Sequence, residues 1–179
     1  MVAVGPSARW ASFGSRSAEE DRGQGMGIRA GLAASLAMIT AVASPAIAQD
    51  SVAPSARAAV AVVDAFHGAL KRGDTVAAAA LLADDALIFE SGGVERTKAE
   101  YAARHLPADA EFAQATSSVV THRNGRSDGT LAWIASEGRT TGKFRGKAIN
   151  STSTETMLLR RWGPGWKIVH IHWSSAAAH

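Results

Sequence analysis

The sequence predicts an α+β protein in which helices come first and pack on one face of a curved antiparallel sheet. In the segment 51–72, apolar residues recur at three- and four-residue steps, the period of a helix that buries one stripe. From Phe112 onward, long strand-like runs joined by short turns are typical of an antiparallel meander. Helices that precede the strands, rather than alternate with them, favour the α+β class.

Two helices open the predicted domain. We expect the first over residues 51–72, with Gly73 as its end. Asp74 is a good cap for a second, alanine-rich helix over Thr75–Leu82. The apolar stripe of the first helix consists of Val60, Val63, Phe66, His67 and Leu70.

A short hairpin and a third helix follow. Ala86–Ser91 has the composition of a strand, and residues 94–96 can pair back on it after a glycine turn. Residues 97–100 have the form of a capping box, which starts a helix over Lys98–Leu106. We expect Pro107 to end this helix.

Four strands form the second half of the predicted domain, over residues 116–123, 130–139, 150–161 and 166–174. In the last of these, side chains alternate between two faces. One face carries Trp166, Ile168, His170 and His172, and the other carries Lys167, Val169, Ile171 and Trp173. Because Lys167 begins the second face, we expect the histidine face to look into the cavity beneath the helices. The second face is apolar enough to favour a homodimer formed through the sheet.

The N-terminal residues have the features of an export signal. Arg29 precedes an apolar stretch of roughly 14 residues, which is short for a membrane span of roughly 20. The small residues 46–48 then form a cleavage site, so residues 26–48 are predicted to be a signal peptide that is cut after Ala48. Residues 1–25 are expected to be a non-native or disordered leader, and 49–179 the domain. The mature protein would be periplasmic or secreted, without a membrane segment.

Composition excludes several classes of function. The chain has 179 residues and no cysteine, which excludes a disulfide framework, a thiolate zinc site and a cysteine nucleophile. Its 19 Lys and Arg residues against 16 Asp and Glu residues are a mild imbalance without basic runs. We therefore expect no nucleic-acid partner.

The order of elements resembles the NTF2-like cone fold, and its SnoaL-like and DUF4440-type members in particular. The residues that carry the resemblance are Phe66–Asp74, Leu81–Asp85, Glu90–Gly92, Glu100-Tyr101, His105-Leu106, Gly165–Ile168 and His172–Ser174. The resemblance implies a conical pocket between the sheet and the helices, and frequent dimers. Ketosteroid isomerase is a distant relative in this superfamily. Its chemistry needs a tyrosine and a protonated aspartate beside a carboxylate base, but Tyr101 is the single tyrosine here and no aspartate matches as its partner.

Histidines and carboxylates are the residues best suited to chemistry in this chain. In the first hypothesis, His172 or His105 is a general acid or base, because an imidazole titrates near pH ~6.5. Glu90 or Glu155 would orient the imidazole, and Tyr101 would donate a hydrogen bond to a substrate oxygen. Glu155 shares a face with apolar residues, so it needs a partner such as an imidazole. The reactions that fit are cofactor-independent isomerisation, dehydration or hydrolysis.

Two other hypotheses use the same region. His170 and His172 lie two residues apart on a strand, and with His105 they could bind zinc or copper. Alternatively, the pocket binds a small molecule without catalysis, and the aromatic residues either line it or fill the core. The predicted ligand-binding residues are His67, Phe89, Trp133, Glu155, Trp166 and His170.

Overall fold

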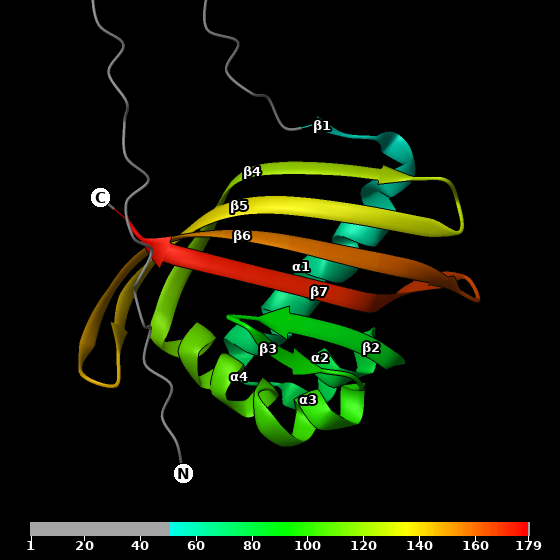
Figure 1. Ribbon diagram of the computed structural model, residues 1–179. Helices are drawn as coiled ribbons and strands as arrows, with labels where there is room; N and C mark the ends of the chain where they lie inside the picture. Colours follow the sequence, from blue (N-terminus) through cyan, green and yellow to red (C-terminus); the bar gives the residue numbers. More distant parts are fainter. Residues whose placement is uncertain (1–50, 179) are drawn as a thin grey trace, which may run out of the picture. The chain divides into compact units, whose positions relative to one another are not determined.

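The structure is a computed structural model that describes residues 51–178, so the predicted leader, signal peptide and cleavage site lie outside the described residues. One seven-stranded sheet has the order β1-β4-β5-β6-β7-β2-β3, and the helices cover one of its faces (Figure 1). The strands are β1 (Ser51–Val52), β2 (Leu82–Glu90), β3 (Gly93–Glu95), β4 (Thr116–Ser127), β5 (Leu131–Phe144), β6 (Lys147–Trp162) and β7 (Gly165–Ala177). The α+β class and the meander of the four long strands are confirmed.

Local signals position the first helices as expected. After a short 3₁₀ turn (Pro54–Ala56), α1 runs over Arg57–Arg72 and ends at Gly73, which has a φ of 73°. The Asp74 carboxylate accepts a 2.9 Å hydrogen bond from the Ala77 amide and caps α2 (Thr75–Leu81). The predicted C-terminal ends of both helices are therefore correct to within one residue. The predicted start of the first helix at residue 51 is wrong, because Ser51–Val52 pairs with β4 as strand β1 and α1 begins only at Arg57.

The third helical region is longer than the sequence indicates. Thr97 caps α3 (Lys98–Arg104) through a 3.1 Å bond from the Glu100 amide. After a break at His105, α4 (Leu106–Ala115) continues the helical path. The prediction that Pro107 ends the helix is wrong. Pro107 lies in the first turn of α4, where its missing N–H costs no intrahelical hydrogen bond.

The sheet curves around the helices. Its long strands β4, β5 and β6 bend toward α4, and the tip of the β5–β6 hairpin lies against that helix through Phe112 and Phe144, whose ring centroids are 5.2 Å apart. Gly142 sits at this bend with a φ of 145°, and a Cβ there would lie 3.0 Å from the Thr116 Cα. The curvature leaves a concave inner face toward α1.

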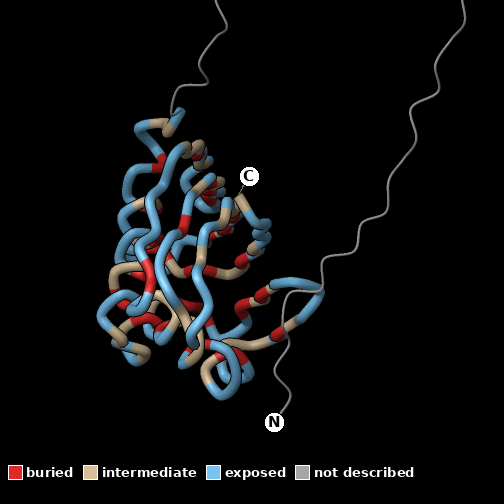
Figure 2. The backbone as a smooth tube through the Cα atoms, turned by 90° about the vertical axis from the view of Figure 1, so that its left-hand side faces the viewer, coloured by how far each residue is buried: buried red, intermediate tan, exposed pale blue. Residues whose placement is uncertain are grey.

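The core fills the space between this inner face and the helices, where the buried segments of Figure 2 gather. Its largest side chains are Val63, Phe66, Leu82, Ile88, Tyr101, Leu106, Ile134, Met157, Leu159, Ile168 and Ile171. Within the described residues, no helix is long and apolar enough to cross a membrane.

A β-bulge in β7 changes which side chains face the core. Ile168 pairs with Leu159 of β6 and His170 pairs with Leu158, so Val169 is an extra residue without a partner on β6. The side-chain alternation therefore shifts by one residue after Ile168. The prediction that His170 and His172 face the cavity is wrong: Ile171 and Trp173 do, and the two histidines lie on the outer face of the sheet.

Candidate functional site

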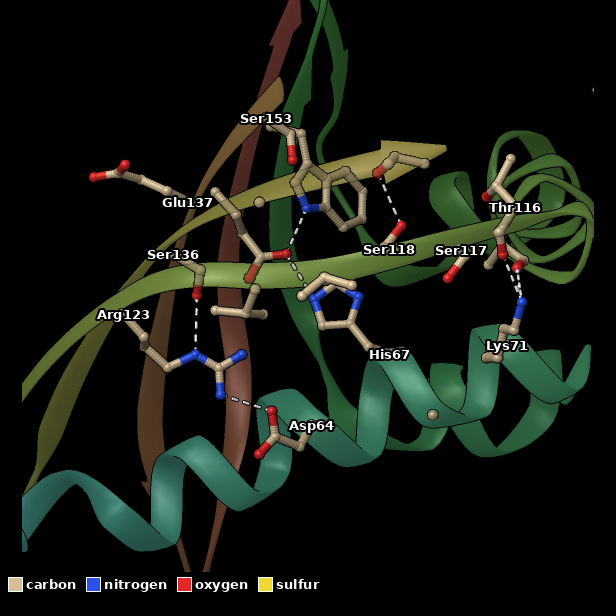
Figure 3. A pocket seen from close by; sticks show the side chains of 18 residues that line it. Asp64, His67, Lys71, Thr116, Ser117, Ser118, Arg123, Ser136, Glu137 and Ser153 are labelled. Carbon is tan, nitrogen blue, oxygen red and sulfur yellow. Dashed lines mark hydrogen bonds and ion pairs between the residues drawn. The ribbon is translucent and has the colours of Figure 1, made fainter. Parts of the chain in front are cut away.

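A cleft lined by both polar and apolar residues lies between α1 and the concave face of the sheet, and we call it the α1 cleft (Figure 3). Its volume is about 410 Å³. Helix α1 contributes Asp64, His67, Gly68 and Lys71, which repeat at three- and four-residue steps and so share one helical stripe. Strands β4, β5 and β6 contribute hydroxyl groups and the charged residues Arg123, Glu137 and Glu155, and Trp173 of β7 closes one side.

His67 and Glu155 form the central pair of the cleft. His67 Nε2 lies 2.7 Å from Glu155 Oε2, and Trp173 Nε1 donates to the same oxygen across 2.7 Å. The Glu155 side chain is 9% exposed and that of His67 is 42% exposed. Burial acts to raise the pKa of Glu155, but the hydrogen bonds from His67 and Trp173 outweigh it and hold the pKa below its ordinary value of 4.5. Glu155 is therefore ionised near neutral pH.

An ionised Glu155 determines which nitrogen of His67 carries the proton. A carboxylate can only accept hydrogen bonds, so His67 Nε2 must be the donor. In the neutral imidazole, Nδ1 then has a lone pair. Within the part of the chain that the structure describes, Nδ1 has no hydrogen-bond partner. The pair is therefore arranged to accept a proton at Nδ1, with Glu155 stabilising the resulting imidazolium.

An ion pair between Asp64 and Arg123 holds α1 on the sheet at one end of the cleft. Arg123 Nη1 donates to Asp64 Oδ1 across 2.7 Å, and its Nε donates to Ser136 Oγ across 3.1 Å. The Arg123 side chain is mostly buried, whereas Asp64 is largely exposed. This arrangement fixes the spacing between α1 and strands β4 and β5 near His67.

Lys71 and several hydroxyl groups form the opposite end of the cleft. Lys71 Nζ donates to two backbone oxygens, those of Ala113 at 3.0 Å and Thr116 at 2.5 Å. Ser118 Oγ and Thr140 Oγ1 are hydrogen-bonded to each other at 2.8 Å on the sheet below. Figure 3 shows Lys71, Thr116, Ser117 and Ser118 gathered on this side of His67.

The predicted residues Tyr101, His105 and Glu90 belong to another group, which lies where α3 and α4 meet the β2–β3 hairpin. Tyr101 Oη donates to Asp109 Oδ2 across 2.7 Å. His105 Nδ1 pairs with the buried carboxylate of Glu95. Burial, and then the negative charge of neighbouring carboxylates, raise the pKa of Glu90 and of Tyr101.

Asp109 also has an elevated pKa, because burial outweighs the hydrogen bond from Tyr101. The structure thus contains a tyrosine–aspartate pair that the sequence comparison with ketosteroid isomerase did not reveal. Tyr101 is fully buried, and its hydroxyl proton is already donated to Asp109. The expected hydrogen bond from Tyr101 to a substrate is therefore not available in this arrangement.

Trp173 separates the α1 cleft from this second group. Its ring stacks on Phe66 with centroids 6.3 Å apart, and its centroid is 6.4 Å from that of Tyr101. Its cross-strand partner on β2 is Glu90. The indole thus lies between the His67–Glu155 pair and the Tyr101–Asp109 pair.

Four predicted ligand-binding or catalytic residues lie away from the cleft. His170, His172 and Phe89 form a cluster on the outer face of the sheet, where the Phe89 ring centroid lies 5.1 Å from that of His170 and 6.2 Å from that of His172. Trp133 lies on the same outer face and is 40% exposed. Placing these side chains in the cavity was wrong, for the histidines because of the bulge at Val169. Trp166 faces inward as expected but is buried in the core, 6% exposed.

The three histidines considered as metal ligands are not brought together. His105 lies at the α3–α4 junction, on the helical layer, while His170 and His172 lie on the outer face of the sheet. Among residues 51–178, no group of three or more His, Cys, Asp or Glu side chains is close enough to hold a metal ion.

Sequence reasoning missed Asp64, Lys71, Arg123 and Trp173 as cleft residues. A signal for two of them was present, because Asp64, His67 and Lys71 are spaced three and four residues apart on a helix. The other two come from strands whose register depends on bulges at residues 121 and 169.

The domain matches known proteins along most of its length. A family defined as the SnoaL-like domain matches residues 59–178. Among solved structures, a protein from Shewanella frigidimarina provisionally named a ketosteroid isomerase is 34% identical, with a TM-score of 0.65 over 69% of this chain and 100% of that chain. No curated protein matches the sequence.

More distant structures share the fold. A provisionally named dehydratase of the NTF2-like family from Streptomyces avermitilis is 17% identical, with a TM-score of 0.59 over 69% of this chain and 97% of that one. A provisionally named scytalone dehydratase from Novosphingobium aromaticivorans is 14% identical, with a TM-score of 0.58 over 69% and 87%. With the SnoaL-like match over two thirds of its length, the chain belongs to the SnoaL-like family and has the NTF2-like fold.

Proposed function

We propose that this protein binds a small molecule in the α1 cleft and that His67, oriented by Glu155, is its general acid or base. The observation that carries the proposal is the 2.7 Å contact between His67 Nε2 and the buried, ionised Glu155 in that cleft. A carboxylate behind an imidazole holds the ring in one orientation and stabilises its protonated form. The free Nδ1 then takes a proton from the ligand.

The reaction class follows from a single base that, among the described residues, is hydrogen-bonded to Glu155 and not to a serine or threonine hydroxyl that it could activate as a nucleophile. His67 Nδ1 removes a proton from a carbon next to a carbonyl group, and the electron pair moves into an enolate. The proton returns to another carbon in an isomerisation. In a dehydration it goes to a hydroxide leaving group, which departs as water. The names of the relatives, an isomerase and two dehydratases, are consistent with this class. No step uses a metal or cofactor.

Exchange of carbon-bound protons for deuterium tests the proposal without knowledge of the substrate. A panel of small ketones in D₂O is followed by proton NMR with the wild-type protein, with His67→Ala and with Glu155→Gln. We expect the protein to accelerate exchange, and His67→Ala to reduce that acceleration by about 10²–10⁴-fold.

His172→Ala is the matched control, because the structure places this histidine on the outer face of the sheet. It should exchange at the wild-type rate. Full exchange activity in a folded His67→Ala variant would remove His67 from the mechanism.

We also propose that the outer face of the sheet binds a second copy of the chain. Leu131 and Trp133 are 43% and 40% exposed there, and Phe89, Leu158 and His170 are partly exposed on neighbouring strands. An apolar sheet face of this kind is typical of a subunit interface. Light scattering should give a dimer mass for the wild type and a monomer mass for Trp133→Glu. A monomeric wild type would contradict the proposal.

Export of the protein is proposed from residues 26–48 alone. N-terminal sequencing of protein recovered from outside the cytoplasm should begin at Gln49. A mature N-terminus upstream of Met26 would overturn both the cleavage site and the leader assignment.

A further inference from the structure

We propose that the ligand of the α1 cleft is a small carboxylic acid whose carboxylate binds Lys71 while its carbonyl end reaches His67. This inference rests on the proposed function of His67 and adds the chemical class of the ligand. The evidence is the charge balance of the cleft, the hydrogen bonds of Lys71 and the space next to Gly68.

The carboxylates of the cleft are already committed or point elsewhere. Asp64 is paired with Arg123 at 2.7 Å. Glu155 accepts from both His67 and Trp173. Glu137 is exposed, and its carboxylate points away from the cleft in Figure 3. No acidic side chain among the described residues pairs with Lys71.

Lys71 is held in place by neutral groups that do not cancel its charge. Its ammonium group donates to the backbone oxygens of Ala113 and Thr116. An ammonium has three N–H donors, so one remains for a ligand. The surrounding cleft surface includes Ser117, Ser118 and Thr140, whose hydroxyl groups suit a carboxylate, beside apolar residues that suit a short carbon chain. This end of the cleft therefore has a net positive charge and no acidic partner of its own.

Gly68 leaves room between Lys71 and His67. A glycine inside a helix costs up to about 1 kcal/mol relative to alanine. Packing does not demand it here, because the nearest atom to an added Cβ is the flexible Nη1 of Arg72 at 3.2 Å. Gly68 lines the cleft, so the missing side chain provides space for a ligand.

The spacing along α1 sets the size of the acid. His67 and Lys71 are four residues apart, which corresponds to a rise of about 6 Å on the same face of a helix. A ligand that bridges them has a carboxylate at one end and a carbonyl group roughly that far away. Oxo-acids with a short carbon chain meet this requirement.

Binding of matched acids and amides tests the inference. The probes are 4-oxopentanoate, 5-oxohexanoate and 6-oxoheptanoate, each compared with its primary amide, in NMR titrations of ¹⁵N-labelled protein at low salt. The wild type should bind the best acid about tenfold or more tightly than its amide, since a charge-assisted hydrogen bond is lost in the amide. Added salt should reduce this preference.

Two substitutions of Lys71 complete the experiment. Lys71→Met keeps the apolar stem and should bring the affinity ratio of acid to amide close to one, whereas Lys71→Arg should retain most of the preference. A merely structural role for Lys71 would change both affinities together and leave the ratio intact. The inference is overturned if no acid binds, if the amides bind as tightly, or if the preference survives in Lys71→Met.

Failure of this inference can be distinguished from failure of the proposed function. If Lys71→Met keeps the preference for the acid while His67→Ala loses proton exchange, the inference that a carboxylate binds Lys71 is wrong and the proposed acid–base role of His67 stands. If Lys71→Met loses the preference while His67→Ala exchanges protons at the wild-type rate, the carboxylate site at Lys71 stands and the proposed acid–base role of His67 is wrong.

Discussion

Trp173 and His67 donate to the same carboxylate oxygen, Oε2 of Glu155, each across a distance of 2.7 Å. The two donors come from β7 and α1, and the acceptor comes from β6, so three elements meet at one atom. One of the donors is the proposed base and the other is an indole that also packs on Phe66. The ionised carboxylate of Glu155 therefore orients the proposed base His67 and also holds the Trp173 ring that packs on Phe66.

Glu155→Gln should destabilise the protein by about 1 to 3 kcal/mol at pH 7, because charge-assisted hydrogen bonds to a buried acceptor are weakened. The pKa of Glu155 is lower in the folded state than the ordinary 4.5, so its contribution to stability is complete above that pH and is lost as the pH falls through the folded-state pKa. Urea denaturation between pH 3 and 7 should show this acid-side loss in the wild type and a flatter profile in the variant. Parallel profiles would contradict the assignment.

Trp173→Phe should separate the hydrogen bond from the packing. Phenylalanine keeps an aromatic ring against Phe66 and Tyr101 but removes the donor to Glu155, so the expected cost is about 0.5 to 1.5 kcal/mol. The pKa of Glu155 should rise, because one of the groups that lower it is lost. Carboxyl chemical shifts of labelled glutamate measured against pH report this change.

Trp173→Ala is the companion variant. It removes the ring as well and should cost about 3 kcal/mol. Equal stabilities of the two variants would show that the indole contributes through its hydrogen bond alone.

Asp109→Asn should show how much the buried Asp109 carboxylate destabilises the protein when it is ionised. The amide oxygen can still accept from Tyr101, so folding is retained. Burial raises the folded-state pKa of Asp109 above the ordinary 3.8, so the wild type loses stability as the pH rises between these two values. The stability of the variant relative to the wild type should therefore improve with increasing pH, as measured by urea denaturation at pH 3, 5 and 7.

Tyr101→Phe provides the control for that experiment, because it removes the hydrogen bond that lowers the pKa of Asp109. Its stability relative to the wild type should worsen as the pH rises. The same trend in both variants would rule out an elevated pKa of Asp109 as the cause.

Alanine at the two glycines of the α1 region should have opposite effects. Gly68→Ala should stabilise the protein by about 0.5 to 1 kcal/mol, because alanine loses less conformational entropy than glycine when the helix forms. It should also weaken ligand binding, since Gly68 lines the cleft.

Gly73→Ala should destabilise by about 1 kcal/mol or more, because alanine disfavours positive φ. The φ of Gly73 is 73°, and an added Cβ would lie 2.5 Å from Gln114 Nε2. Thermal unfolding of the two single variants gives both signs in one comparison. A stabilising Gly73→Ala would contradict the left-handed cap.

The helix ends that are determined by residues close together in the sequence could be predicted from the sequence. Gly73 and Asp74 mark the ends of two helices because a left-handed cap and a side-chain acceptor each act within one turn. Pro107 could not be resolved in this way, because proline can follow one helix or begin another.

The site was less predictable because its contacts join distant segments. His67 and Glu155 were both expected near a pocket, and an imidazole partner for Glu155 was anticipated, but 88 residues separate them. Their pairing depends on how α1 crosses the sheet. His170 and His172 were assigned to the wrong face because no glycine or proline marks the bulge at Val169; the extra residue is visible in the pairing with β6.

The extra residue at Val169 also has an evolutionary consequence. Removing Val169 would restore simple alternation along β7 and would leave Ile171 and Trp173 on the inner face, because His170 would follow Ile168 directly and keep its pairing with Leu158. A deletion of that one codon would therefore change the length of β7 without exchanging the indole of Trp173 for an imidazole in the cavity. A bulge of this kind lets related proteins differ by one residue in the length of this strand while the side chains that line the interior stay the same.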